Sequence, residues 1–229
     1  MSSESVVNVY PLAGYSFGVN EAKVYKDVSL CDKLDRIRAN YTREGIRRSV
    51  EGILLVHEYE CPHLLLLQKG NKIIKLPGGH LRPGENEIEG LKRKLTSNLS
   101  SNSGNYQPDW KIEECVGAWW RPNFETLMLP YRPPHNTKPK ECKKIYVVHL
   151  PEKEYLACPK NMKILAVPLF ELYNNIQVEA YGPELSSIPP QLSRYLLSRV
   201  LSKSEESAGQ LFWTLVYPRH RISELSVYY

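Results

Sequence analysis

The residues best suited to chemistry lie in one segment, LPGGHLRPGENEIEGLKRKLTSNLSS, which runs from Leu76 to Ser101. A glycine turn leads into the glutamates Glu85, Glu87 and Glu89 at the start of a helical pattern. Carboxylates gathered on one face of a helix can hold Mg²⁺ or a similar hard cation against a diphosphate. The same acids also suit an ordinary solvated helix N-terminus, because the helix macrodipole favours negative charge there. The spacing of the neighbouring residues favours the second interpretation.

The segment has the layout of a Nudix box, G-x5-E-x7-R-E-U-x-E-E-x-G-U, in which U is an aliphatic residue. Its first half fits, with matches at Gly79, Glu85, Arg93 and Leu95. Its second half departs from the pattern at Lys94, which replaces a glutamate, at Ser97 and Asn98, which replace the metal-binding pair, and at Ser100, which replaces a glycine. A lysine puts positive charge where the cation would sit, and Ser and Asn are weak ligands. We therefore expect no hydrolysis, no catalytic residue, no bound metal and no cofactor.

Composition predicts a single globular domain. The 229 residues are 42% hydrophobic and 24% charged, which suits one sizeable core. The net charge of +5 and the pI near 8.8 permit an anionic partner without requiring one. Five cysteines without a C-x-x-C pair predict reduced, mostly buried thiols, and the six histidines lack metal-ligand spacing. The absence of a secretory signal and of an apolar run near ~20 residues predicts a soluble, intracellular protein without a membrane partner.

Hydrophobic periodicity predicts the elements that must position the box. Apolar residues at helical spacing predict helices at Ser29–Glu44, Asn86–Leu99 and Pro189–Val200. Asp27 or Ser29 can cap the first helix. Shorter apolar runs predict strands at Arg47–Tyr59, His63–Gln68, Lys72–Leu76, Trp110–Trp120, Lys144–Leu150 and Lys163–Phe170.

Strands that bracket helices, with varied connections, predict the α/β class. We expect a Nudix-type α/β/α sandwich with a mixed sheet and an N-terminal extension. Residues 1–44 would form an arm and a helix packed on the core, and residues 45–200 the Nudix-like domain, with the degenerate box at 79–101. Residues 201–229 would form a C-terminal extension. Its apolar stretch Leu211–Tyr217 leaves open an added edge strand or a loose, flexible attachment.

A wider set of sequence blocks is more specific than the box. The blocks NVYPLAGYSFG, RRSVEGILLVHE, KLPGGHLRPGE, EGLKR, GAWWRPNFE, PHNTKPKECKK, PKNMKILAVPLFELY and YGP occur in this order between about Val7 and Tyr195. Together they resemble the small Nudix-like subunit of pre-mRNA cleavage factor I, also called cleavage factor Im. The resemblance implies a nuclear homodimer that does not hydrolyse nucleotides. It also implies recognition of UGUA elements in pre-mRNA and binding to a larger subunit that carries an RNA-recognition motif.

The resemblance also implies an RNA-binding site. The positions that match RNA-contacting residues of the family are Glu51, Lys33, Leu76, Tyr181 and Gly182. At Glu51, a carboxylate can accept hydrogen bonds from base amino groups, which phosphate contacts cannot replace as a source of specificity.

The residues alone also admit a plainer interpretation of these positions. Glu51 would then be a strand-end carboxylate paired with Arg47 or Arg48. Leu76 would be a core residue, and Tyr181 a loop aromatic packed on the core.

Three positions depart from the family pattern. Lys33 stands where the family has an arginine, and it lacks the planar fork needed for bidentate recognition. Tyr25 stands where the family has an acidic residue. The pair Ile73-Ile74 replaces two phenylalanines, one of which stacks on a base, and such stacking is worth about 1–3 kcal/mol. The lysines beside this pair offer phosphate contacts or simply a solvated hairpin. We therefore expect weak or relaxed UGUA binding.

Three functional hypotheses follow. The first is a non-catalytic RNA-binding subunit of the 3′-end cleavage and polyadenylation machinery, which guides poly(A) site choice. The second is a structural adaptor that dimerises and holds the larger cleavage-factor subunit with little RNA contact of its own. The third is a residual hydrolase of dinucleoside polyphosphates. The missing carboxylates at Ser97 and Asn98 argue against the third, although binding of a dinucleotide without turnover stays open.

Overall fold

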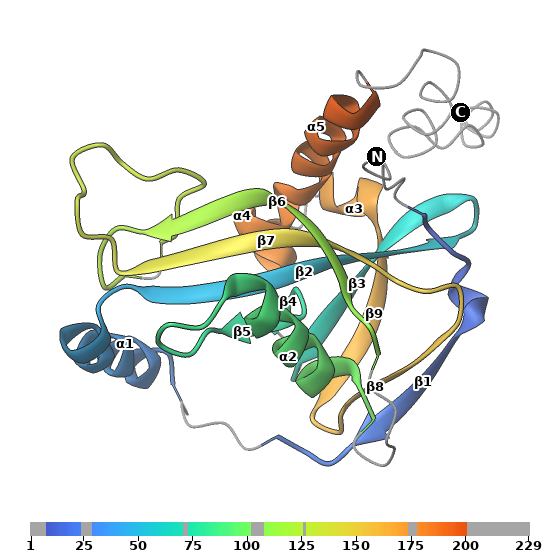
Figure 1. Ribbon diagram of the computed structural model, residues 1–229, viewed down its shortest axis with the longest axis horizontal. Helices are drawn as coiled ribbons and strands as arrows, with labels where there is room; N and C mark the ends of the chain where they lie inside the picture. Colours follow the sequence, from blue (N-terminus) through green and yellow to red (C-terminus); the bar gives the residue numbers. More distant parts are fainter. Residues whose placement is uncertain are drawn as a thin grey trace, which may run out of the picture.

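The structure is a computed structural model that describes residues 8–23, 29–70, 73–101, 108–125, 127–173 and 178–200 (Figure 1). The side chains of Lys33 and Tyr181 lie outside the description, as do Tyr25, Asp27 and residues 201–229. The elements are η1 (Leu12–Gly14), β1 (Tyr15–Asn20), α1 (Leu30–Glu44), β2 (Arg47–Glu58), β3 (Cys61–Lys69), β4 (Ile73–Lys75), β5 (Gly78–His80), α2 (Glu87–Leu99), β6 (Lys111–Arg121), β7 (Glu141–His149), β8 (Glu154–Pro159), β9 (Met162–Pro168), α3 (Leu169–Tyr173), α4 (Val178–Ser186) and α5 (Ile188–Val200).

A mixed sheet forms the centre of the molecule. Its strands run in the order β4-β3-β2-β7-β6, with β5 paired to β2 and β9 paired to β3. The pair β2–β7 is parallel, whereas β2–β3 and β6–β7 are antiparallel. The strands β1 and β8 form a separate parallel pair. This arrangement confirms the predicted α/β class and mixed sheet.

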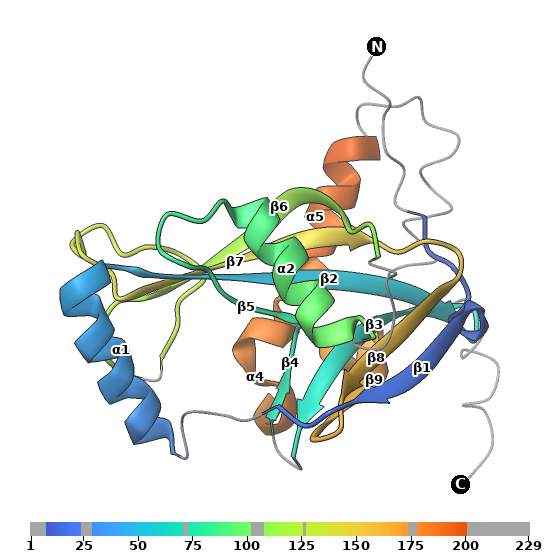
Figure 2. The same ribbon diagram turned by 60° about the horizontal axis from the view of Figure 1, so that its bottom comes forward.

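Strand β2 is apolar on both faces because helices cover both sides of the sheet. Its side chains Val50, Leu54 and Val56 belong to one core cluster, which also contains Leu91 and Leu95 of α2. The alternate side chains Ile53 and Leu55 of β2 belong to a second cluster, built with residues of α3, α4 and α5. Figure 2 shows α2 in front of the sheet and α4 behind it. The run GILLV therefore reads as a buried strand rather than as an alternating one.

Helix α1 begins with a complete capping box. The hydroxyl of Ser29 accepts a hydrogen bond from the Asp32 backbone N–H, and the Asp32 carboxylate accepts one from the Ser29 N–H. Of the two caps that the sequence allows, Ser29 is thus in use, and the helix ends at Glu44 as predicted. The helix lies beside the start of β2 (Figure 1).

The predicted strand Lys163–Phe170 is too long. Strand β9 ends at Pro168, and Leu169 and Phe170 already belong to α3. A proline lacks the N–H that would extend the ladder, so the chain leaves the sheet there. The elements β1, β5, β8, α3 and α4 have no counterpart among the predicted elements, because their sequences show no clear apolar run or helical repeat.

Two compositional expectations can also be compared with the structure. All five cysteines are free; Cys61, Cys142 and Cys158 are buried, whereas Cys31 and Cys115 are exposed. Within the described residues, no helix has the length and apolarity needed to cross a membrane.

Candidate nucleic-acid interface and degenerate box

Glu85 connects the loop of the box to its helix through hydrogen bonds. Its two carboxylate oxygens accept hydrogen bonds from Nε and Nη2 of Arg93, both at 2.6 Å. The Arg82 backbone N–H donates to the same carboxylate at 2.7 Å. The hydrogen bond from Arg93 is the main reason that the pKa of Glu85 falls to about 2. The carboxylate thus ties the loop to the box helix.

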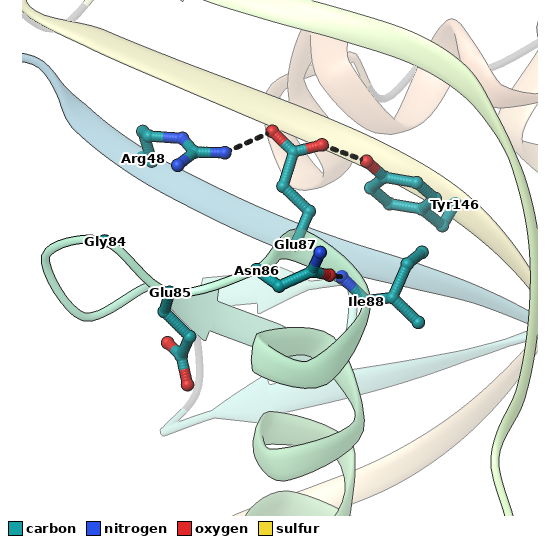
Figure 3. Close-up of a pocket in the computed structure, with 7 residues that line it drawn as sticks. All are labelled: Arg48, Gly84, Glu85, Asn86, Glu87, Ile88 and Tyr146. Atoms are coloured by element: carbon teal, nitrogen blue, oxygen red, sulfur yellow. Dashed lines mark hydrogen bonds and ion pairs between the residues drawn. The ribbon is translucent and has the colours of Figure 1, made fainter.

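Glu87 is engaged on the opposite side of the loop, in a pocket of about 430 Å³ (Figure 3). It accepts hydrogen bonds from Arg48 at 2.6 Å, from Lys144 at 2.9 Å and from the Tyr146 hydroxyl. Burial opposes ionisation of this carboxyl, but these donors overcome it and lower its pKa to about 2. The carboxylates of Glu85 and Glu87 point apart in Figure 3, so they do not converge on one ion.

The positions that carry metal-binding glutamates in an active box carry basic and neutral side chains here. Lys94 lies across Gly79, since a Cβ on that glycine would meet Lys94 Cδ at 3.1 Å. Asn98 donates to the carbonyl of Gly78 at 2.9 Å. Its amide oxygen accepts from the ammonium of Lys23 at 2.7 Å. No group of three or more His, Cys, Asp and Glu side chains suited to a metal occurs in the described part of the chain. These residues do not fit a divalent cation.

Glu51 lies in a partly buried cluster of charges. Lys143 Nζ is 3.3 Å from Glu51 Oε1 and 2.5 Å from Glu184 Oε2. Strand β7 supplies Lys143 because it pairs in parallel with β2, and α4 supplies Glu184. Only 12% of the Glu51 side chain is exposed. The sequence motifs did not indicate Lys143 or Glu184, because each is a single charge far from Glu51 along the chain.

The predicted pairing of Glu51 with Arg47 or Arg48 is wrong. Successive side chains of a strand alternate between its faces, so Arg48 faces α2 and pairs with Glu87. Arg47 shares the face of Glu51, but four residues of strand separate the two by roughly 13 Å. Arg47 lies instead 3.4 Å from Glu141.

The cluster around Glu51 offers carboxyl oxygens as hydrogen-bond acceptors. Burial raises the pKa of Glu51, while Lys143 opposes that rise. Burial also opposes ionisation of Lys143, yet Glu51 and Glu184 raise its pKa overall. Two carboxylates share one ammonium here, so the cluster suits a ligand that donates hydrogen bonds, such as the amino group of a base.

The remaining predicted site residues are spread over several elements. The Leu76 side chain is only 2% exposed and packs in the second core cluster, so only its backbone is left to meet a ligand. Gly182 has φ +73° and interrupts α4 just before Pro183, so the chain turns two residues before Glu184, at Gly182. Helix α4 lies against β4, and Ile73 of β4 is 55% exposed. Lys33 lies in the first turn of α1.

Glu51, Ile73 and Gly182 therefore come from elements that border one region, which β2, β4 and α4 form together. The side chain of Lys33 lies outside the described residues, so its place in this group stays a prediction.

Comparison with known proteins gives consistent matches. Residues 5–195 match the NUDIX_2 family model, which is described as a nucleotide hydrolase. The chain is 62% identical over 202 residues to pre-mRNA cleavage factor Im 25 kDa subunit 2 of Arabidopsis thaliana, covering 88% of this chain and 100% of that protein. It is 50% identical over 190 residues to subunit 1 of the same organism, covering 83% and 85% of the two chains. Cleavage and polyadenylation specificity factor subunit 5 of Dictyostelium discoideum is 53% identical over 183 residues, with coverages of 79% and 89%.

Proposed function

The chain belongs to the NUDIX_2 family and to its group of pre-mRNA cleavage factor Im 25 kDa subunits, and we propose that it is a non-catalytic, RNA-binding subunit of the nuclear pre-mRNA 3′-end cleavage and polyadenylation machinery. The 62% identity over the full length of one such subunit carries this proposal. The altered box supports the absence of catalysis, because Lys94, Ser97 and Asn98 replace the metal-binding carboxylates.

The proposed RNA site centres on Glu51. The partly buried charge cluster there accepts hydrogen bonds from base edges, while Ile73 and the Tyr181-Gly182 segment border it. Contacts to base edges, unlike contacts to phosphates, distinguish one sequence from another. The ligand of this site is a UGUA element of pre-mRNA, and Leu76 contributes through its backbone.

Fluorescence anisotropy with a labelled UGUA RNA and a scrambled RNA of equal composition tests this site. We expect the UGUA RNA to bind more tightly, and we expect Glu51→Gln to reduce the preference by about tenfold. A hydrogen bond to a charged group is worth about 1.5–3 kcal/mol, which agrees with that factor. Equal binding of both RNAs by the wild-type protein would contradict the proposal.

The adaptor hypothesis remains as the second candidate because Ile73 offers a base no aromatic ring. In that role the chain would form a homodimer and hold a larger subunit with an RNA-recognition motif. A Glu51→Ala, Tyr181→Ala variant that has lost RNA binding separates the two candidates. If this variant still captures the larger subunit and still supports cleavage in a reconstituted reaction, the adaptor role is the main one. If it captures the subunit but cleavage fails, RNA binding is the function.

A further inference from the structure

A lysine from the N-terminal arm occupies the metal position of the box. The ammonium of Lys23 donates to the backbone carbonyl and the hydroxyl of Ser97 at 2.6 and 2.9 Å. It also donates to the Asn98 side-chain oxygen at 2.7 Å. Ser97 and Asn98 are the positions that hold the metal-binding glutamate pair in an active box. A built-in cation, held by three oxygens, therefore lies where that box would hold a divalent ion.

The backbone of Lys23 is fixed as firmly as its side chain. Asn161, in the turn between β8 and β9, accepts from the Lys23 N–H at 3.1 Å and donates to the Lys23 carbonyl at 2.7 Å. This reciprocal pair holds the arm beside the box helix. The ammonium is thus placed by the fold and is not a loose surface charge.

Lys94 adds a second cation on the same face of α2. Residues 94, 97 and 98 share a helix face because they are three and four positions apart. Lys94 crosses the glycine turn, so that its Nζ would lie 3.6 Å from a Cβ on Gly79. Burial, Lys94 and Lys75, in that order, lower the pKa of Lys23 to about 8. Besides burial, the positive charges of Lys94 and Lys75 thus act on the Lys23 ammonium.

The nearby acid does not cancel this positive charge. The carboxylate of Glu85 is bound in bidentate fashion by Arg93 and receives a further hydrogen bond from the Arg82 backbone. All three protons of the Lys23 ammonium go to Ser97 and Asn98, so Lys23 contributes charge rather than a hydrogen bond to a ligand. The hydrogen bond to a bound ligand would therefore come from the ammonium group of Lys94.

The cationic group lies next to the proposed RNA site. A Cβ on Gly78 would lie 3.0 Å from the Cγ of Glu51. The Gly78 carbonyl accepts a hydrogen bond from Asn98, whose amide oxygen accepts one from Lys23. Gly78 packs directly on β2, where a Cβ would approach the Val50 carbonyl oxygen at 2.2 Å. Its neighbour Gly79 is the residue that Lys94 crosses. A single polyanion can therefore present a base edge to Glu51 and a phosphate to the lysines.

We propose that the former metal position of the box binds a phosphate of the RNA backbone directly, with Lys94 as donor and Lys23 as a fixed positive charge in place of the divalent ion. In an active box the metal links helix carboxylates to a diphosphate. Here ammonium groups meet the phosphate without a metal between them. The choice of RNA as the source of the phosphate rests on the proposed function.

The test compares Lys94→Met with Lys92→Met in anisotropy titrations with UGUA RNA. Lys92 lies on the same helix and pairs with Asp109 at 3.9 Å, so it controls for loss of one positive charge. We expect Lys94→Met to weaken binding by three- to tenfold and to reduce the slope of log affinity against log salt by about 0.7, the contribution of one phosphate on a single strand. Lys92→Met should change neither. A Lys94→Gln variant and thermal unfolding curves guard against a folding defect.

An RNA in which one phosphodiester at a time is a neutral methylphosphonate locates the contact. For the wild-type protein, one such replacement should weaken RNA binding by the same factor as the Lys94→Met substitution does. For the Lys94→Met protein, the same replacement should weaken RNA binding no further. If that replacement still weakens binding to Lys94→Met by the same factor, or if Lys94→Met binds RNA like the wild type, the assignment is overturned.

Displacement of the RNA by inorganic pyrophosphate separates the two possible sources of phosphate. Pyrophosphate binding that is lost in Lys94→Met, with RNA binding unaffected, would assign the phosphate to a nucleotide and overturn the RNA assignment. If the wild type fails to prefer UGUA over scrambled RNA, the proposed function falls, and the pyrophosphate arm still decides whether the lysines form a phosphate site.

Discussion

Lys143 shows how strongly one residue can depend on its neighbours. Its ammonium is the shared partner of Glu51 and Glu184, and 16% of its side chain is exposed. Removing one member of a buried ion pair leaves an uncompensated charge, which typically costs about 3–5 kcal/mol. In this cluster the loss of Lys143 would leave two carboxylates facing each other.

Lys143→Met should therefore lower the free energy of unfolding by about 3–5 kcal/mol at pH 7. The loss should shrink at pH 5, because burial raises the pKa of Glu51, so this carboxyl takes up a proton more readily as the pH falls and then no longer repels Glu184. Urea unfolding at both pH values measures this. Lys144→Met provides the comparison on the neighbouring residue, whose 36% exposed side chain points to Glu87 instead. An equal loss at both pH values would argue against charge repulsion as the cause.

Ile73 carries the clearest prediction for affinity. It is 55% exposed on β4, at the position where the resemblance implies a stacking phenylalanine. Ile73→Phe should tighten UGUA binding roughly tenfold, since a stacked base is worth about 1–3 kcal/mol. Ile73→Leu keeps the apolar bulk without a π-face and should leave the affinity near that of wild type. If both variants bind alike in anisotropy titrations, stacking is not what this position lacks.

In the loop before α2 and at the start of that helix, the acidic residues Glu85 and Glu87 stabilise the fold. Glu85 closes the loop onto Arg93, and Glu87 joins α2 to β2 and β7 through Arg48, Lys144 and Tyr146. The pKa of each carboxyl falls to about 2, below the ordinary value of 4.5. The stabilisation they provide is present above about pH 4.5 and is lost as the pH falls toward 2.

The loss of this stabilisation at low pH leads to a prediction for Glu87→Gln. The variant should melt several degrees below wild type at pH 7, because three donors lose a charged acceptor. As the pH falls from 4.5 to 2, the melting temperature of the wild type should approach that of Glu87→Gln, because the Glu87 carboxylate becomes protonated. Differential scanning calorimetry across that range gives the comparison. A constant gap down to pH 2 would show that the carboxylate charge is not the source of stability.

The elements also show where sequence reasoning works and where it stops. The helix Asn86–Leu99 was predicted within one residue, because Ile88, Leu91, Leu95 and Leu99 repeat at helical spacing. The β5 strand was not predicted, because GGH has no side-chain pattern and is held in the sheet by pairing with β2. The role of Lys23 was equally hidden. One lysine in an arm, 74 residues from its partner Ser97, gives no local signal.

At the scale of the whole molecule, the fold places two binding chemistries side by side. Glu51 lies on the α4 side of β2, and α2 with the lysines of the box packs on its other side. Gly78 of β5 lies between the two, because a Cβ on it would be 3.0 Å from Glu51 Cγ and its carbonyl accepts a hydrogen bond from Asn98 of α2. The sequence indicated the lost metal ligands at Ser97 and Asn98, but only the tertiary structure shows which cation replaces the metal. The predicted division into an arm at 1–44, a domain at 45–200 and an extension at 201–229 stays a prediction, as do the homodimer and the larger partner subunit.

RNA binding without a metal is tested by titrating the full-length protein with UGUA RNA in Mg²⁺ and in EDTA, together with a turnover assay on a dinucleoside polyphosphate. We expect UGUA to be preferred over scrambled RNA equally in both conditions, Glu51→Gln to reduce this preference by about tenfold, and no substrate to be cleaved. Binding that requires Mg²⁺, or metal-dependent turnover that Glu85→Gln abolishes, would contradict it.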